Sequence, residues 1–189
     1  MRRVHLALYF PGGSIPGQDP FDDRLAWVTV RSLEQAGARV VTVRYDDSLL
    51  DPDRELFESG VRREVSGALA FHQPDRVTVL GKSRGTHALK LVCSEPFELP
   101  DDTRIIWLTP VWRADESWKA ACANTIPSLH IVGLADHEYH DAERHAAVTG
   151  ETVEIGGADH RLEVAGDVFA TLDAWRTMAE TIVRFASRA

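Results

Sequence analysis

One serine in this chain has glycines two positions before and after it and lies between a strand pattern and a helix pattern. The apolar run 77–80 leads into Gly81-Lys82-Ser83-Arg84-Gly85, and a helical pattern follows it. A sharp turn at this point lifts the serine hydroxyl clear of a sheet, and the glycines let neighbouring backbone pass where a Cβ would clash. The segment is therefore constrained to a strand–turn–helix unit with an exposed serine at its apex.

The letters Gly-Lys-Ser in the same segment also suggest a phosphate-binding loop, but the spacing excludes one. Such a loop needs another glycine five positions earlier and a flexible stretch between the two. That position is Arg76, and strand-like residues fill the interval. A nucleotide-binding function is therefore not predicted.

Strand and helix patterns alternate along the chain. Strands are predicted at 4–10, 38–44, 76–81, 103–109, 127–133 and 152–155, and helices at 21–36, 52–72, 84–94, 114–123, 138–147 and 166–187. The strands are mostly apolar throughout, which is typical of a sheet buried on both faces. The last helix carries one apolar stripe that we expect to be buried, made of Val168, Leu172, Trp175, Ala179, Ile182 and Phe185. We predict an α/β fold with a mostly parallel sheet, in a single domain over residues 1–189.

Composition and charge exclude several classes of partner. The net charge of −8 argues against nucleic-acid and anionic membrane partners, which require a basic face. No apolar run is long enough to span a bilayer, and the run 4–10 is too short for a secretion signal. Cys93 and Cys122 form no paired motif and are expected to be free thiols in a reducing compartment. We expect a cytoplasmic protein, whose oligomeric state the sequence leaves open.

A serine hydroxyl needs help to act as a nucleophile near neutral pH. A histidine must take its proton, and an acid must orient that histidine. In parallel sheets functional groups gather at the carboxyl ends of strands, which narrows the choice among the eight histidines. Asp136 follows the fifth predicted strand, and His160 follows the sixth in a glycine-rich loop. Ser83, Asp136 and His160 are therefore the predicted catalytic residues, in that chain order.

Other residues near these positions compete for a role. Asp159 adjoins His160, but neighbouring side chains in a turn usually diverge, so we expect Asp159 to cap the loop. His137, His140 and His145 suggest a metal cluster, yet they lack the paired spacing of metal ligands and fall in the predicted helix 138–147. We predict no metal and no cofactor.

With these residues in place, the chain resembles the alpha/beta-hydrolase superfamily, and in particular its compact members without a lid domain. The resemblance covers essentially the whole chain and rests on the segments 81–85, 133–136 and 157–160. It implies one alpha/beta-hydrolase domain with a six-stranded sheet in the order 2-1-3-4-5-6 and helices on both faces, without the first two strands of the full superfamily fold. It also implies a serine hydrolase that cleaves a small ester or thioester through an acyl-enzyme on Ser83.

The resemblance further implies an oxyanion hole built from two backbone N–H groups. One belongs to Arg84. The other belongs to the loop after the first strand, where Pro11-Gly12-Gly13 is similar to the family's His-Gly-x segment and Gly13 takes the donor position. Gly12 and Ser14 are alternative donors and are expected to line the substrate site.

The identity of the substrate stays open. Trp112 follows the fourth predicted strand and is interpreted either as a wall of the substrate pocket or as part of the core. Lys82 and Arg84 flank the serine, either paired with surface carboxylates or attracting an anionic substrate. If an alcohol or amine replaces water, the same site is an acyltransferase or cyclase. The hypothesis from another class is a hydrolase-fold module that binds a ligand or partner without turnover.

Overall fold

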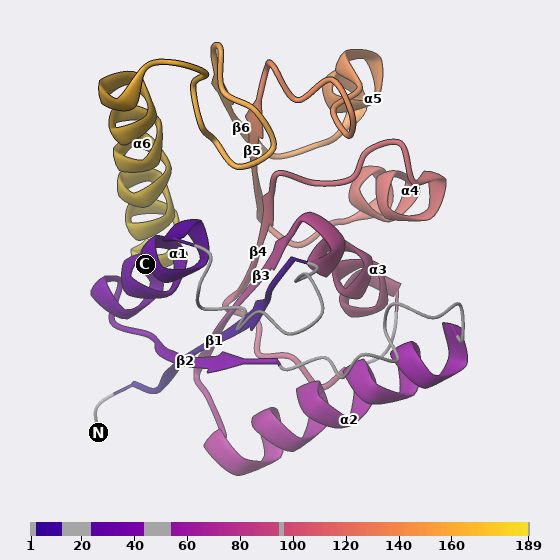
Figure 1. Ribbon diagram of the computed structural model, residues 1–189. Coiled ribbons are helices and arrows are strands. Elements are labelled where there is room, and N and C mark those ends of the chain that lie inside the picture. The colour runs from indigo at the N-terminus through magenta and orange to yellow at the C-terminus, as the bar shows by residue number, and fades with distance from the viewer. Residues whose placement is uncertain (1–2, 13–23, 44–53, 95–96, 189) are drawn as a thin grey trace.

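The computed structural model describes residues 3–12, 24–43, 54–94 and 97–188, and strands and helices alternate along them (Figure 1). The strands are β1 His5–Phe10, β2 Arg39–Thr42, β3 Arg76–Lys82, β4 Thr103–Leu108, β5 Ser128–Gly133 and β6 Glu151–Ile155. The α-helices are α1 Arg24–Gln35, α2 Arg54–His72, α3 Thr86–Ser94, α4 Asp115–Ala123, α5 Ala142–Ala147 and α6 Val168–Ser187. A short 3-10 helix, η3 Ser83–Gly85, joins β3 to α3.

The strands form one six-stranded sheet in the order β2-β1-β3-β4-β5-β6. Every neighbouring pair is parallel; Leu8 of β1, for example, lies between Val41 of β2 and Val79 of β3. The predicted fold class and strand order are confirmed. Because all strands run in one direction, the turns after β3, β5 and β6 leave the sheet at the same edge.

Both faces of the sheet are apolar and covered by helices. Along β1, Leu6 and Leu8 point into one cluster of buried residues, whereas Ala7 and Tyr9 point into the other. The first cluster lies under α2, α3 and α4, and the second lies under α1 and α6 (Figure 1). This double coverage explains why the strands are apolar at consecutive positions.

The main difference from the predicted elements lies after β5, where the helix expected over 138–147 begins only at Ala142. The carboxylate of Asp136 accepts a hydrogen bond from the backbone N–H of Tyr139 at 3.1 Å, which folds the chain into a turn instead. The carboxylate of Asp141 then caps the first turn of α5. Residues 134–141 therefore form a series of turns that begins beside the predicted catalytic acid.

The apolar stripe of α6 is buried only in its second half. Ile182 and Phe185 pack with residues of α1, but Val168 and Leu172 are 71% and 51% exposed. The prediction that the whole stripe is buried is wrong, because the first turn of α6 contributes nothing to the cluster formed with α1. Neither α6, with its 20 residues, nor any other helix in the described part of the chain is long and apolar enough to cross a membrane.

Candidate active site

Ser83 occupies a sharp turn between β3 and the helix that follows. Its φ of +51° lies in the left-handed region, which L-residues seldom adopt. A Cβ on Gly85 would lie 2.1 Å from the carbonyl oxygen of Phe10, and a Cβ on Gly81 would lie 2.7 Å from the carbonyl oxygen of Gly85. Both glycines are therefore required by close backbone approach, as the sequence pattern predicts.

The hydroxyl of Thr86 and the loop after β1 support the turn. The Thr86 hydroxyl donates a hydrogen bond to the Ser83 carbonyl oxygen at 2.5 Å. A Cβ on Gly12 would lie 3.2 Å from the Ser83 Cβ, so the backbone of this loop passes directly beside the nucleophile. Gly13 and Ser14, the other candidates for the oxyanion donor of this loop, lie outside the described residues.

The three predicted catalytic side chains lie in one chain of hydrogen bonds. His160 Nδ1 is 2.6 Å from Asp136 Oδ2, and His160 Nε2 is 2.7 Å from Ser83 Oγ. An ionised carboxylate only accepts hydrogen bonds, so the imidazole proton belongs on Nδ1. Nε2 is then free to accept the Ser83 hydroxyl proton, which is the tautomer a general base requires.

Asp136 is held ionised at the carboxyl end of β5. Its side chain is buried, with 5% of the residue exposed. Burial by itself raises the pKa of the carboxyl group. The hydrogen bond and charge of His160, together with the backbone N–H groups of Tyr139 and Glu138, outweigh burial and hold the pKa below its usual value. The carboxylate is therefore charged at neutral pH and oriented by its own turn.

Tyr139 also contacts the predicted triad, although it is not among the site residues predicted from the sequence. Its ring centroid lies 4.4 Å from that of His160, with the ring planes tilted by 46°. The aromatic ring thus covers part of the imidazole while its backbone N–H binds Asp136. The available signal was an aromatic residue three positions after an aspartate that forms a turn.

Solved structures of several hydrolases resemble this fold at low sequence identity. No protein-family model matches the chain, and no curated protein matches its sequence. A protein described as a YdeN-like hydrolase from Pectobacterium atrosepticum superposes with a TM-score of 0.67 at 17% identity, over 97% of this chain and 91% of that one. The dienelactone hydrolase from Anabaena variabilis gives a TM-score of 0.63 at 19% identity, over 96% and 87%. A CIB-like hydrolase from Thermoplasma acidophilum gives 0.66 at 14% identity, also over 96% and 87%.

The chain has the alpha/beta-hydrolase fold. Ser83, Asp136 and His160 lie just past the carboxyl ends of β3, β5 and β6 of this fold. They are 53 and 24 residues apart along the chain and meet only because these strands are parallel.

Asp159 does not compete with Asp136 for the imidazole. Its Oδ1 accepts hydrogen bonds from the backbone N–H groups of Arg161 at 2.7 Å and Glu163 at 3.0 Å. The expectation that Asp159 caps the loop is confirmed. The cap shapes the segment that places His160 next to Ser83.

Trp112 lies in the core and not on the rim of the alpha/beta-hydrolase site. It has no exposed surface, and its indole N–H donates to His145 Nδ1 at 3.3 Å. Its ring centroid lies 5.7 Å from that of Trp107 and 5.6 Å from that of His130. The substrate-wall interpretation of Trp112 is therefore corrected to core packing.

The histidines around α5 do not form the surface cluster that the sequence suggested. His145 is buried rather than exposed, and its ring packs edge-on against that of His140. Burial, reinforced by the charge of His140, lowers the pKa of His145 despite the opposing charge of Glu154. Among the described residues, no group of three or more His, Cys, Asp or Glu side chains is arranged to hold a metal ion.

Lys82 and Arg84, the two cations that flank Ser83, differ in their surroundings. Lys82 is buried, with 6% of the residue exposed. Arg84 is exposed, yet its side chain forms no ion pair with any residue that the structure describes. For Arg84, the expected pairing with a surface carboxylate is not found among the described residues.

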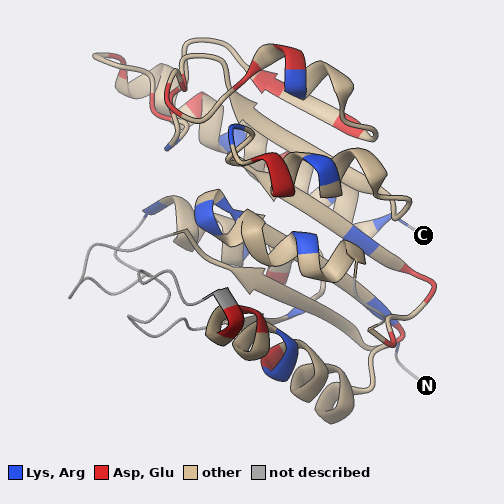
Figure 2. Cartoon of the chain, turned by 90° about the vertical axis from the view of Figure 1, so that its right-hand side faces the viewer, with Lys and Arg blue, Asp and Glu red and all other residues tan. Residues whose placement is uncertain are grey.

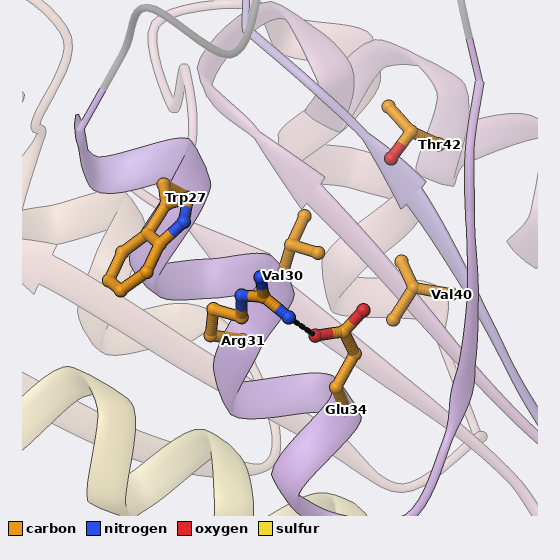
Figure 3. Close-up of a pocket in the computed structure, with 6 residues that line it drawn as sticks. All are labelled: Trp27, Val30, Arg31, Glu34, Val40 and Thr42. Atoms are coloured by element: carbon orange, nitrogen blue, oxygen red, sulfur yellow. Dashed lines mark hydrogen bonds and ion pairs between the residues drawn. The ribbon is translucent and has the colours of Figure 1, made fainter.

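A separate groove of about 330 Å³ lies between α1 and the edge strand β2 (Figure 3). It is lined by Trp27, Val30, Arg31, Glu34, Val40 and Thr42. The ion pair between Arg31 and Glu34, at 2.7 Å, lies along one side of it. None of these residues belongs to the predicted triad.

Proposed function

We propose that the chain is a serine hydrolase that cleaves an ester or thioester of a small organic substrate through an acyl-enzyme on Ser83. The observation that carries the proposal is the hydrogen-bonded series Ser83–His160–Asp136, with distances of 2.7 and 2.6 Å. The positive φ of Ser83 supports it, because strained backbone of this kind clusters at active sites.

In the first half of the reaction, Ser83 Oγ attacks the substrate carbonyl carbon while the hydroxyl proton moves to His160 Nε2. The charge of Asp136 stabilises the imidazolium that forms. The developing oxyanion accepts hydrogen bonds from the backbone N–H of Arg84 and from one donor in the loop after β1, for which we propose Gly13. The tetrahedral intermediate collapses, and the leaving alcohol or thiol takes the proton from His160.

In the second half, water attacks the acyl carbon and gives its proton to His160 Nε2. Collapse of the second intermediate returns that proton to Ser83 Oγ and releases the carboxylic acid. The cycle uses one water and needs no further reactant.

Covalent labelling with a fluorophosphonate tests the proposal. We expect one adduct per chain, mapped to Ser83 by mass spectrometry, and hydrolysis of 4-nitrophenyl acyl esters by the same preparation. Ser83→Ala should abolish both signals, whereas the matched control Ser94→Ala, an exposed serine on α3, should retain them. Absence of both signals in the wild-type protein would indicate a binding module, and an adduct on another serine would overturn the assignment of the nucleophile.

A further inference from the structure

Arg84 is an exposed cation that follows the nucleophile directly and has no counterion in the described part of the chain. Some arginines there are paired, such as Arg76 with Asp102 at 2.6 Å and Arg144 with Asp115 at 2.6 Å, whereas Arg113 and Arg161, like Arg84, form no ion pair with a described residue. The chain has 29 acidic and 21 basic residues, and the two kinds are interspersed along the helices in the view of Figure 2. What distinguishes Arg84 from Arg113 and Arg161 is that it directly follows Ser83 in η3.

The charge of Arg84 reaches the side of the site where Tyr139 and His160 lie. The pKa of Tyr139 is raised by its hydrogen bond with Glu138, by burial and by the Glu138 charge, and Arg84 is the cation that opposes this rise. The pKa of His87 is lowered by burial first, then by Lys90, and Arg84 contributes in the same direction. The Arg84 charge therefore acts on Tyr139, whose ring packs on His160, and on His87.

The surroundings of Arg84 favour an anion. Binding a carboxylate would not require Arg84 to leave an existing ion pair, and a guanidinium matches a carboxylate with two parallel hydrogen bonds. The amino-terminal end of α3, which begins two residues later, adds positive potential. Glu138 is an exposed carboxylate on the same side and opposes anion binding, so a group with a single negative charge is favoured over a doubly charged phosphate.

We propose that Arg84 is a specificity-determining residue, and that the hydrolase prefers acyl substrates carrying a carboxylate close to the scissile bond. This inference rests on the proposed serine-hydrolase function and adds the class of substrate to it. The backbone N–H of Arg84 and its side chain then have separate tasks, since the former binds the oxyanion and the latter binds the substrate carboxylate.

Two pairs of esters test the proposal, and each pair differs mainly in one negative charge. The first compares 4-nitrophenyl hemisuccinate with 4-nitrophenyl butyrate, which places the carboxylate in the acyl group. The second compares the acetyl ester of 4-hydroxybenzoate with that of methyl 4-hydroxybenzoate, which places it in the leaving group. The measured quantity is the ratio of kcat/KM for the anionic ester to kcat/KM for the neutral ester.

We expect wild-type protein to favour the anionic ester in at least one pair, and Arg84→Gln to lower that ratio about 10-fold. Arg84→Lys should give an intermediate ratio, because it keeps the charge but loses the two-pronged geometry. The wild-type ratio should also fall as salt rises from about 0.05 to 0.5 M, and that of Arg84→Gln should not. Arg161→Gln is the matched control, since Arg161 is exposed and directly follows His160.

The outcomes separate this inference from the proposed function. If wild-type protein hydrolyses both esters of each pair and Arg84→Gln leaves the ratios unchanged, the substrate class is overturned and the serine-hydrolase function stands. A larger loss of the ratio in Arg161→Gln than in Arg84→Gln would assign carboxylate recognition to Arg161 instead. If no ester is hydrolysed and no fluorophosphonate adduct forms, both proposals fail together.

Discussion

Replacing Asp136 with asparagine changes one atom of the predicted triad and should remove most of its activity. The carboxylate accepts from His160 Nδ1 at 2.6 Å and from the backbone N–H groups of Tyr139 and Glu138. An asparagine side chain has one oxygen and cannot replace both acceptors. If the oxygen faces the backbone donors, the amide N–H faces His160, and the imidazole must move its proton to Nε2, where it can no longer accept the Ser83 proton.

The structure sets the size of this effect. To keep the productive tautomer, the asparagine must turn its NH2 group toward the backbone N–H donors of Tyr139 and Glu138, and each lost acceptor costs about 1–3 kcal/mol. The total of about 2–6 kcal/mol corresponds to a loss of about 30-fold to about 10⁴-fold in kcat/KM, at 1.36 kcal/mol for each factor of ten.

The matched control is Asp159→Asn in the neighbouring loop. Both hydrogen bonds of Asp159 end on a single oxygen, which the asparagine amide oxygen replaces, so kcat/KM should change less than about threefold. Hydrolysis of a 4-nitrophenyl ester measures both variants, and urea unfolding verifies that each is folded. Wild-type-like activity in Asp136→Asn, or a larger loss in Asp159→Asn, would refute the assigned roles.

Three further predictions concern stability, and urea unfolding tests each of them. Burial lowers the pKa of His130 from 6.5 to about 4. Between these pH values the unfolded chain binds a proton at His130 that the folded chain does not, so the free energy of unfolding should fall by about 3 kcal/mol as the pH drops from 6.5 to about 4. In His130→Gln, the free energy of unfolding should fall less steeply between these pH values than in wild type. Parallel plots of this free energy against pH for the two proteins would contradict the prediction. Ser83→Gly should be about 1 kcal/mol more stable than Ser83→Ala, because only alanine keeps a Cβ at a φ of +51°; equal stabilities would show that the turn is unstrained. Gly85→Ala should cost about 3 kcal/mol or more, whereas Gly60→Ala, with open space around it on α2, should stabilise the protein by about 0.5–1 kcal/mol. Tolerance of Gly85→Ala would contradict the close approach to Phe10.

The fold was predictable because its signals are local. Apolar runs between turn residues placed the strands, and positions just past strand ends identified Ser83, Asp136 and His160. The parts that were missed depend on contacts distant in sequence or on competition between local structures. Trp112 could not be assigned to the core before the packing of Trp107 and His130 was known. Turns replaced the first four residues of the helix predicted over 138–147, because a side-chain carboxylate accepts a hydrogen bond from the backbone N–H of Tyr139.

The position of Ser83 and the proposed recognition of substrate charge depend on different parts of the neighbouring residues. Around Ser83, the backbones of Gly12, Gly81 and Gly85 approach their neighbours too closely to accept larger residues without rearrangement. The position of Ser83 therefore depends on contacts that few substitutions can preserve. Arg84, by contrast, would use only its backbone N–H for the proposed oxyanion hole, and its exposed side chain contributes no ion pair among the described residues. A change at this position can therefore alter which substrate charge is accepted without rebuilding the elbow. This separation is what makes the ester-pair comparison a test of specificity rather than of folding.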